Sequence, residues 1–344
     1  MGLKQYIARR AVYTVILLVV IVVFNFFLFQ IVPFQVSCPG LSQYQCAQLL
    51  YVPPAPAHAG TNVTAVIEHE RAEVMAAYGF NDPVMTRFGK YMVNMFTGQF
   101  GFNIGGTLGG PVLQTVEQKI PYTVLLLGSA TIVGFIIGML LGVLAASKRG
   151  KVLDVSSLGV LLFINALPVF FLGGLLILLQ IIGFGKGYSN VGAVTIATTG
   201  WATILPVLSS LWLPFLTLTL ATIGGVFLTM RATMIDTLGE DYVIMARAKG
   251  LPERTVLYKH SFRNAVIPIA TLFAITIGFI LGGAVVTETV FSWPGLGRAI
   301  YDGVVSNDFP LEQAIFFIIS IMVLIAIFLV DIIYGLLDPR IRTG

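Results

Sequence analysis

Few residues in this sequence have the types and spacing that catalytic or metal-binding chemistry requires. The three histidines, His58, His69 and His260, are far apart, and no two of them have the spacing of metal ligands on one helix. The sequence contains no HExxH helix, no Ser/Lys dyad and no GxxxxGK[ST] loop for nucleotide phosphates. We therefore expect no catalytic residue, metal site or cofactor in this chain, and no ATP bound through a P-loop.

Two carboxylates fall within apolar stretches, where an ionisable side chain costs several kcal/mol and is a functional hypothesis by default. Asp331 lies toward the C-terminal end of the last apolar stretch, and Glu288 lies near the end of the stretch before it. Each is open to two interpretations, a functional group in the membrane or an interfacial residue with a partner. The second interpretation is favoured for both.

The composition of the chain is that of a membrane protein. The 344 residues are 57% hydrophobic and 10% charged, with a mean hydropathy of +0.91, whereas soluble proteins carry about 25% charged residues. This excludes a disordered chain and a nucleic-acid-binding protein, and two cysteines are too few for a disulfide-rich scaffold. The sequence predicts an all-α polytopic membrane protein.

Six stretches are long and apolar enough to cross a bilayer, which takes about 20 residues of helix. They are Ala11–Pro33, Tyr122–Ser147, Leu153–Phe184, Ile204–Met230, Ala265–Phe291 and Ala314–Leu337. Accordingly we divide the chain into residues 1–33 (tail and first helix), 34–121 (a sizeable extracytoplasmic region) and 122–344 (a core with five helices).

The basic residues sort to one side of these spans. One side carries 14 of the 20 Lys and Arg residues and the other carries 6. The first set is Lys4, Arg9, Arg10, Lys148, Arg149, Lys151, Arg231, Arg247, Lys249, Arg254, Lys259, Arg263, Arg340 and Arg342. Because cytoplasmic loops are enriched in Lys and Arg, we expect both termini in the cytoplasm.

The extracytoplasmic region holds both cysteines and one helical pattern. Cys38 and Cys46 lie on the oxidising side, where a disulfide is plausible, although two free or packed thiols are the alternative. Val84, Phe88, Tyr91 and Met95 follow a helical repeat, which predicts an amphipathic helix with a packing role. In the second span Gly134, Gly138, Gly142 and Ala146 recur every four residues and allow close approach of a helix, either a neighbour in this chain or a second membrane subunit.

The loop 231–264 is long, charged and well capped. Residues 241–249 are predicted to form a short helix with Asp241 at its start and Lys249 at its end, and both charges suit the helix dipole. Gly250 falls where a left-handed C-terminal cap belongs, and Pro252 fits the start of a second short helix. This pattern is typical of a docking surface for a soluble protein, although an ordinary connecting loop is the alternative.

The same loop carries a resemblance to a known family. Residues 241–251, Asp-Tyr-Val-Ile-Met-Ala-Arg-Ala-Lys-Gly-Leu, resemble the EAA loop of permease subunits of binding-protein-dependent ABC importers, most closely the first (B-type) permease of the dipeptide/oligopeptide branch. Further matching blocks are Asn81-Asp82-Pro83, Gly98-Gln99-Phe100-Gly101, Ile120-Pro121-Tyr122-Thr123, Arg263-Asn264-Ala265, Pro268, Gly282 to Gly297 with its Ser-Trp-Pro-Gly-Leu-Gly end, Asp331, Tyr334 and Leu337-Asp338-Pro339-Arg340. Gln99 and the segment from about 35 to 75 depart from the family pattern.

The resemblance implies a type I ABC importer permease fold, short peptides as cargo and ATP hydrolysis in separate subunits. The implied partners are a second homologous permease, two ATP-binding subunits, an extracytoplasmic substrate-binding protein and the lipid bilayer of the cytoplasmic membrane, with no nucleic acid. The ATPase-docking coupling helix would consist of Asp241, Tyr242, Met245, Ala246, Arg247, Ala248 and Lys249, with Gly250 as its turn. Ala246 and Ala248 would allow close approach to the ATPase, and Arg247 and Lys249 would pair with its acidic groups.

The translocation path would lie between the two permeases. Polar residues within spans that could line it are Asn165, Ser209, Ser210 and Thr217, and packing explains these residues equally well. Three alternatives stay open: import of oligosaccharides or metal chelates by the same family, a stand-alone secondary transporter or channel, and a membrane-embedded enzyme.

Overall fold

The computed structural model describes residues 3–33, 40–41, 43–51, 75–76, 78–104, 110–185, 201–280 and 284–337. Within these ranges the secondary structure is helical, apart from one isolated bridge between Phe102 and Pro111. The chain forms two compact units, residues 1–121 with 295–344, and residues 122–294. The boundary at residue 122 matches the sequence division, but residues 295–344 join the N-terminal unit, and the domain division itself stays a prediction.

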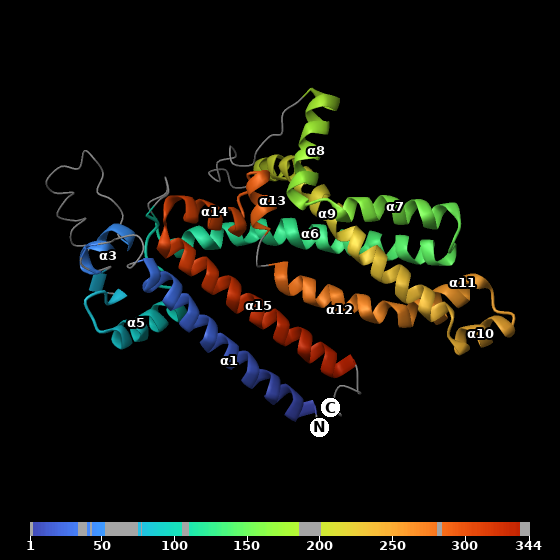
Figure 1. Ribbon diagram of the computed structural model, residues 1–344, viewed down its shortest axis with the longest axis horizontal. Coiled ribbons are helices and arrows are strands. Elements are labelled where there is room, and N and C mark those ends of the chain that lie inside the picture. The colour runs from blue at the N-terminus through green and yellow to red at the C-terminus, as the bar shows by residue number, and fades with distance from the viewer. Residues whose placement is uncertain are drawn as a thin grey trace. The chain divides into compact units, whose positions relative to one another are not determined.

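The first unit is built on two long helices that lie side by side, α1 (Leu3–Gln30) and α15 (Phe309–Leu337) (Figure 1). Gln30 Nε2 donates to Gln313 Oε1 at 3.1 Å, and Arg10 pairs with Asp331 at 3.2 Å. The two helices are therefore antiparallel, because the end of α1 contacts the start of α15 and the start of α1 contacts the end of α15. It follows that the beginning of α1 and the end of α15 lie on the same side of the unit.

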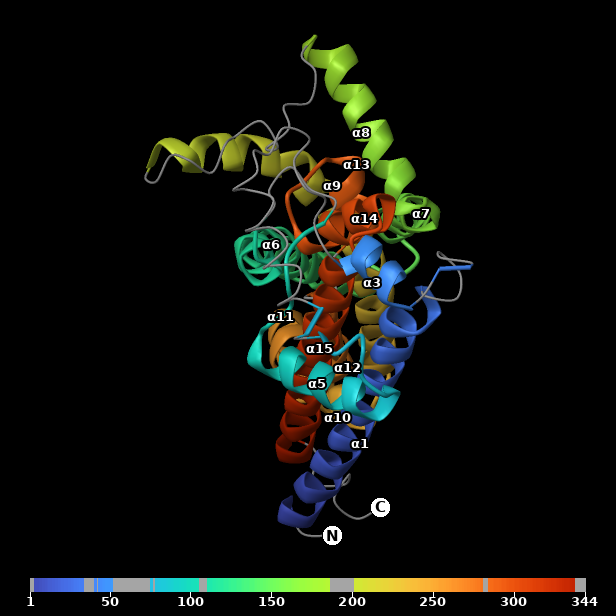
Figure 2. The ribbon, with the colours of Figure 1, turned by 90° about the vertical axis from the view of Figure 1, so that its left-hand side faces the viewer.

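Shorter helices surround the Gln30 end of this pair. They are α3 (Gln43–Tyr51), α5 (Val84–Thr97), the first residues of α6 (Val112–Ser147) and α14 (Leu296–Ser306). Both ribbon views place α5 beside α1 (Figure 1, Figure 2), and Phe26 of α1 contacts the rings of Phe88 and Tyr91 of α5. The predicted amphipathic helix is confirmed, although its buried face is Arg87, Tyr91, Asn94 and Met95 rather than a purely apolar stripe.

Buried polar groups fasten the segments around residues 78–100 to the two long helices. Arg87 Nη2 donates to the Gln30 carbonyl at 2.5 Å, and its guanidinium lies 5.5 Å from the Phe26 ring centroid. Tyr78 donates to the Phe100 carbonyl at 2.5 Å and accepts from Gln313. Burial raises the pKa of the Tyr78 phenol well above its usual value, so the hydroxyl keeps its proton and its role as a donor.

The second unit packs α9 (Trp201–Leu238) against α6, α7 (Val152–Ala166), α8 (Val169–Phe184) and α12 (Phe262–Ile280). The glycine stripe of α6 faces α9: a Cβ on Gly134, Gly138 or Gly142 would lie 2.7–2.8 Å from the Cβ of Thr222, Val226 or Met230. The stripe is therefore occupied by an internal neighbour, which was one of the two predicted occupants. A short helix, α13 (Val285–Val290), follows α12 in this unit.

Within the described residues, five helices are long and apolar enough to span a membrane, or six if α7 and α8 count as one bent span. The third predicted span is wrong as a continuous helix, because α7 and α8 meet at 105° (Figure 1). The break falls at Leu167–Pro168, where Pro168 has no N–H to donate and disfavours helical backbone at the residue before it. Leu167 is extended, with φ −76° and ψ 132°.

Two further span boundaries need correction. The fourth predicted span ends at Met230, whereas α9 continues to Leu238 and takes up the first eight residues of the predicted loop. The fifth is not one helix from Ala265 to Phe291, since α12 ends at Ile280 and α13 is a separate short helix. Residues 281–283 lie outside the described ranges.

The two carboxylates of the apolar stretches, Asp331 and Glu288, both have partners, which was part of the favoured interpretation. Asp331 pairs with Arg10 in the first unit. In the second unit Glu288 is fully buried and accepts a hydrogen bond from Thr123 Oγ1 at 3.1 Å. Trp293, from the Ser-Trp-Pro-Gly block, is buried beside Tyr122 and donates from Nε1 to the Tyr122 carbonyl at 3.0 Å.

Candidate functional site

The short helix predicted at residues 241–249 is present as α10 (Asp241–Ala248) in the second unit. Asp241 lies in its first turn and Arg247 in its last, so both charges are favourable for the helix dipole. At its end Gly250 N–H donates to the Arg247 carbonyl at 2.9 Å and Leu251 N–H to the Ala246 carbonyl at 3.4 Å. This pair of bonds is the Schellman arrangement, and Gly250 has the φ of +74° that the arrangement needs.

One face of α10 is buried within the unit. Val243 and Ala246 pack against Val256, with Leu238 of α9 at the edge of the cluster. Ala246 is only 5% exposed, so it packs inside this chain instead of presenting a small surface to a partner. Ala248, the other alanine of the motif, is exposed.

Two polar links hold α10 to the segments that follow it. The Arg247 guanidinium donates twice to the Glu253 carboxylate, at 2.7 and 3.3 Å, across the Gly250 turn. Asn264 Nδ2 of α12 donates to the Tyr242 hydroxyl at 2.7 Å. These links and the buried face make α10 a fixed projection of the helix bundle.

The second predicted short helix differs from the expectation. Pro252 caps it, and the helix begins at Glu253 as α11 (Glu253–Thr255), continues through a π-helical stretch, η2 (Val256–Ser261), and runs directly into α12. Helix α10 is therefore joined through the Gly250 turn to an unbroken helical segment, Glu253–Ile277, that is long and apolar enough to span a membrane.

Apolar side chains cover the outer side of this projection. Tyr242, Ile244 and Met245 of α10 are exposed, as are Leu251 and Tyr258 beyond it. Met245 is 59% exposed and Ile244 52%. Such a cluster, with the charges of Asp241 and Lys249 beside it, is suited to burial against a protein partner.

The base of the projection is fixed by residues that the sequence analysis did not single out. Arg231 of α9 makes a bidentate ion pair with Asp154 of α7, with N–O distances of 2.6 and 2.8 Å. Thr233 Oγ1 donates to the Ala265 carbonyl of α12 at 3.1 Å. In the sequence Asp154 is visible only as an acidic residue at the start of an apolar stretch, and nothing there indicates its pairing with Arg231.

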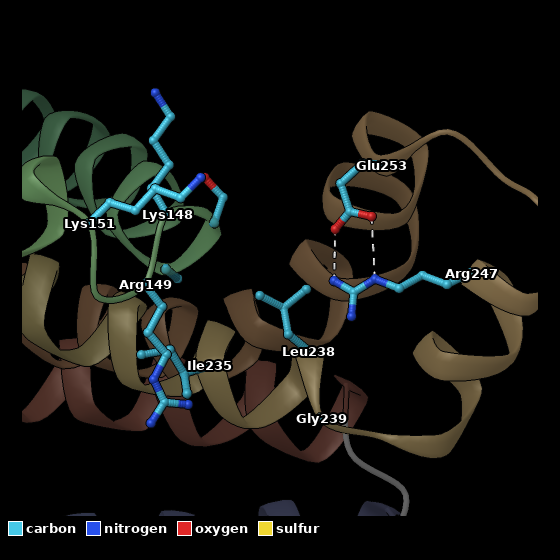
Figure 3. Close-up of a pocket in the computed structure, with 10 residues that line it drawn as sticks. Lys148, Arg149, Lys151, Ile235, Leu238, Gly239, Arg247 and Glu253 are labelled. Atoms are coloured by element: carbon cyan, nitrogen blue, oxygen red, sulfur yellow. Dashed lines mark hydrogen bonds and ion pairs between the residues drawn. The ribbon is translucent and has the colours of Figure 1, made fainter.

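A cavity of about 360 Å³ lies beside α10 (Figure 3). Its walls come from the end of α6, the α6–α7 loop, the end of α9, and the Arg247–Glu253 pair. The loop contributes Lys148, Arg149 and Lys151, so the cavity is strongly basic.

The predicted path residues do not share one environment. Asn165 and Ser209 are exposed, whereas Ser210 and Thr217 are buried. Thr217 Oγ1 donates to the Leu213 carbonyl at 2.9 Å, as expected for a threonine that satisfies its hydroxyl within its own helix. Ser210 and Thr217 are therefore not available to line a path along the exposed surface of this chain.

The predicted disulfide stays a prediction. Cys46 is buried in a cluster with Ala47, Leu50 and Tyr51. Cys38 lies outside the described residues.

The chain is similar to known transport proteins over most of its length. Residues 138–343 match the family model of the binding-protein-dependent transport system inner membrane component. The oligopeptide transport system permease protein AppB of Bacillus subtilis is 34% identical over 80% of this chain and 86% of its own length.

Two other relatives are named for the transport of different substrates. The dipeptide transport system permease protein DppB of Escherichia coli K12 is 28% identical over 88% of this chain and 94% of its own. The metal-staphylopine import system permease protein CntB of Staphylococcus aureus is 33% identical over 79% and 83%.

Proposed function

Because this chain belongs to the family of binding-protein-dependent transport system inner membrane components, we propose that it is a permease subunit of an ABC importer that moves short peptides across the cytoplasmic membrane. The observation that carries the proposal is α10, a fixed helix with an exposed apolar face that projects from the ends of two membrane-spanning helices. A solitary transporter has no evident need for such a projection.

Peptides are the favoured cargo because relatives named for oligopeptide and dipeptide transport cover 80–88% of this chain. A metal chelate is the second candidate, supported by the 33% identity to the metal-staphylopine permease. A ligand screen on the substrate-binding partner distinguishes the two, since that partner makes the first selection of cargo.

Dependence on a binding protein follows from the family. Beyond that, we propose a complex of this chain with a second homologous permease, two ATP-binding subunits and an extracytoplasmic substrate-binding protein. The ATP-binding subunits hydrolyse ATP, so this chain is not itself an enzyme. Its basic side, with both termini, faces the cytoplasm.

The docking helix α10 transmits the motion of the ATPase. The apolar face of Tyr242, Ile244 and Met245 is buried against the ATP-binding subunit, and Lys249 pairs with an acidic group there. Arg247 has a different role, because Glu253 already occupies its guanidinium. Closure of the ATPase dimer on ATP shifts α10 together with α11–α12, which biases the transporter between its inward-open and outward-open states.

The test is Gly250→Trp in the complex reconstituted with its partners. We expect normal insertion but ATP hydrolysis uncoupled from uptake, because Trp in a left-handed conformation distorts the turn after α10. The matched control is Gly185→Trp, another glycine with positive φ (+62°) and open space around it, at the end of α8. Normal substrate-stimulated hydrolysis and uptake in Gly250→Trp would defeat the docking role.

Co-purification tests the assembly. Recovery of two ATPases and a second permease with this chain supports the proposal. Recovery of the chain alone, active in liposomes without ATP, would establish the secondary transporter instead.

A further inference from the structure

The basic cavity beside α10 has more positive charge than the chain itself neutralises. It is lined by Lys148, Arg149 and Lys151, with Ile235 and Leu238 of α9 as apolar wall (Figure 3). The two nearby carboxylates are each engaged by an arginine, Glu253 by Arg247 at 2.7 Å and Asp154 by Arg231 at 2.6 Å. Within the described residues, no ion pair within 4.0 Å involves any of the three loop cations.

The depth of these cations is set by their apolar neighbours. The loop is a tight turn, in which Lys151 N–H donates to the Lys148 carbonyl at 3.0 Å, and it joins the end of α6 at Ser147 to the start of α7 at Val152. Val152 is 84% exposed and Val155 62%, on the outer surface of the unit. In a bilayer such side chains would lie against acyl chains, which would put the adjacent cations at the level of the lipid headgroups.

We propose that this cavity binds the phosphate-bearing headgroup of an anionic phospholipid from the cytoplasmic leaflet. The Lys148, Arg149 and Lys151 side chains extend to different sides of the loop and together supply the positive charge around the headgroup (Figure 3). An acyl chain extends toward Val152 and Val155. Each Lys or Arg that lies within a Debye length of the lipid phosphate raises the affinity of the cavity for the lipid roughly fivefold. The inference is independent of the transported cargo, but it rests on the proposed orientation, which places this loop at the cytoplasmic leaflet.

An acidic segment of the ATPase is the competing occupant. The exposed valines argue against it, because a soluble protein that covered the cations would leave Val152 and Val155 at the rim between protein and lipid. The lipid satisfies both features at once, with its headgroup on the cations and its chain on the valines.

The test uses the assembled transporter in nanodiscs, titrated with phosphatidylglycerol and with phosphatidylcholine and followed by native mass spectrometry. We expect wild type to retain phosphatidylglycerol preferentially, and K148Q/R149Q/K151Q to lose that preference by at least about tenfold. The matched control is R254Q/K259Q, which removes two cations from a separate surface cavity of about 390 Å³ and should leave retention unchanged. The charge-conserving variant K148R/R149K/K151R should bind as wild type does.

Several outcomes would overturn the proposal. If the triple variant retains phosphatidylglycerol as wild type does, the loop cations do not bind lipid. If inorganic phosphate competes equally well, the cavity is a site for free phosphate instead. If the triple variant loses the ATP-binding subunits on purification but still retains lipid, the three cations contact the ATPase and not the lipid. If the triple variant does not assemble, the single variants K148Q and K151Q decide, each with an expected fall of roughly fivefold.

Discussion

Gly250 determines how helix α10 ends. Its φ of +74° is the left-handed conformation, which costs a residue with a Cβ roughly 1–2 kcal/mol. A Cβ added at Gly250 would meet no heavy atom within 4 Å, so any effect of a small side chain there comes from the backbone and not from a clash. The turn can therefore be tested separately from the surface it presents.

We predict that Gly250→Ala weakens coupling and that Gly250→Asn does so less, because Asn tolerates the left-handed conformation. The expected fall in peptide uptake per ATP hydrolysed is about 5–30-fold for Ala, the range that corresponds to 1–2 kcal/mol. The control is Gly174→Ala, a helical glycine of α8 with open space around it. Equal coupling in all three variants would mean that the turn conformation is unimportant.

Arg247 and Lys249 are predicted to act differently although they are two residues apart. Arg247 is held by Glu253 in an exposed bidentate pair, which contributes at most about 1 kcal/mol. We expect Arg247→Ala, Glu253→Ala and the double variant to reduce coupling by the same small factor, since either single change removes the whole pair. Coupling is measured as uptake per ATP hydrolysed.

Lys249→Ala provides the contrast. Because Lys249 is exposed at the end of α10, its loss should weaken association with the ATP-binding subunits and should add to the effect of Arg247→Ala. Additive effects of Arg247→Ala and Glu253→Ala would instead show that Arg247 also contacts the partner.

At the scale of elements, close packing of α6 on α9 depends on three glycines. A Cβ on Gly138 would lie 2.8 Å from the Val226 Cβ and 3.1 Å from the Ile223 carbonyl oxygen. The backbone contact cannot be relieved by a side-chain rotation, so the two helices would have to separate. Overpacking of this kind costs typically about 1–3 kcal/mol.

We therefore predict that Gly138→Ala lowers the thermal unfolding midpoint of the purified complex by at least about 2–4 °C. Gly128→Ala is the control, because Gly128 lies on the same helix with nothing within 4 Å of the added Cβ. It should be neutral or slightly stabilising, since Ala is the better helix former. Equal midpoints for the two variants would contradict the packing that the glycines are inferred to serve.

The elements that could be predicted from the sequence are those with local signals. The start of α10 at Asp241 and its turn at Gly250 follow from capping chemistry that lies within a few residues. The break at Leu167–Pro168 also had a local signal, but apolar length alone suggested one span. The pairing of Arg231 with Asp154 had no such signal, because it joins helices distant in the sequence. The burial of Ala246 was missed because it depends on how α10 folds back against Val256 and Leu238.

The extension of α9 to Leu238 illustrates the same limit. Its last turns carry Arg231, Asp236 and two threonines, a composition that is typical of a loop. These turns are helical because Arg231 forms an ion pair with Asp154 of α7 and Thr233 donates a hydrogen bond to the Ala265 carbonyl of α12. Tertiary partners therefore decide where the helix ends and the projection of α10 begins.

For the whole molecule, the orientation in the membrane rests on two independent arguments. The antiparallel contact of α1 with α15, with Arg10 and Asp331 3.2 Å apart, places the beginning of α1 and the end of α15 on one side. From the excess of Lys and Arg, 14 of 20, we propose that this side is cytoplasmic. The first argument comes from the contacts of a single compact unit, and the second from the sequence alone.

We predict that a fluorescent protein fused after Gly344 fluoresces in bacterial cells and that alkaline phosphatase fused there is inactive, because the reporter remains in the cytoplasm. Alkaline phosphatase inserted near residue 58, in the region 34–121, should be active because that region is exported. A fusion near residue 186, between α8 and α9, is the matched control on the extracytoplasmic side and should also be active. Active alkaline phosphatase at residue 344 would invert the orientation, and with it the placement of α10 and of the basic cavity on the side where ATP is available.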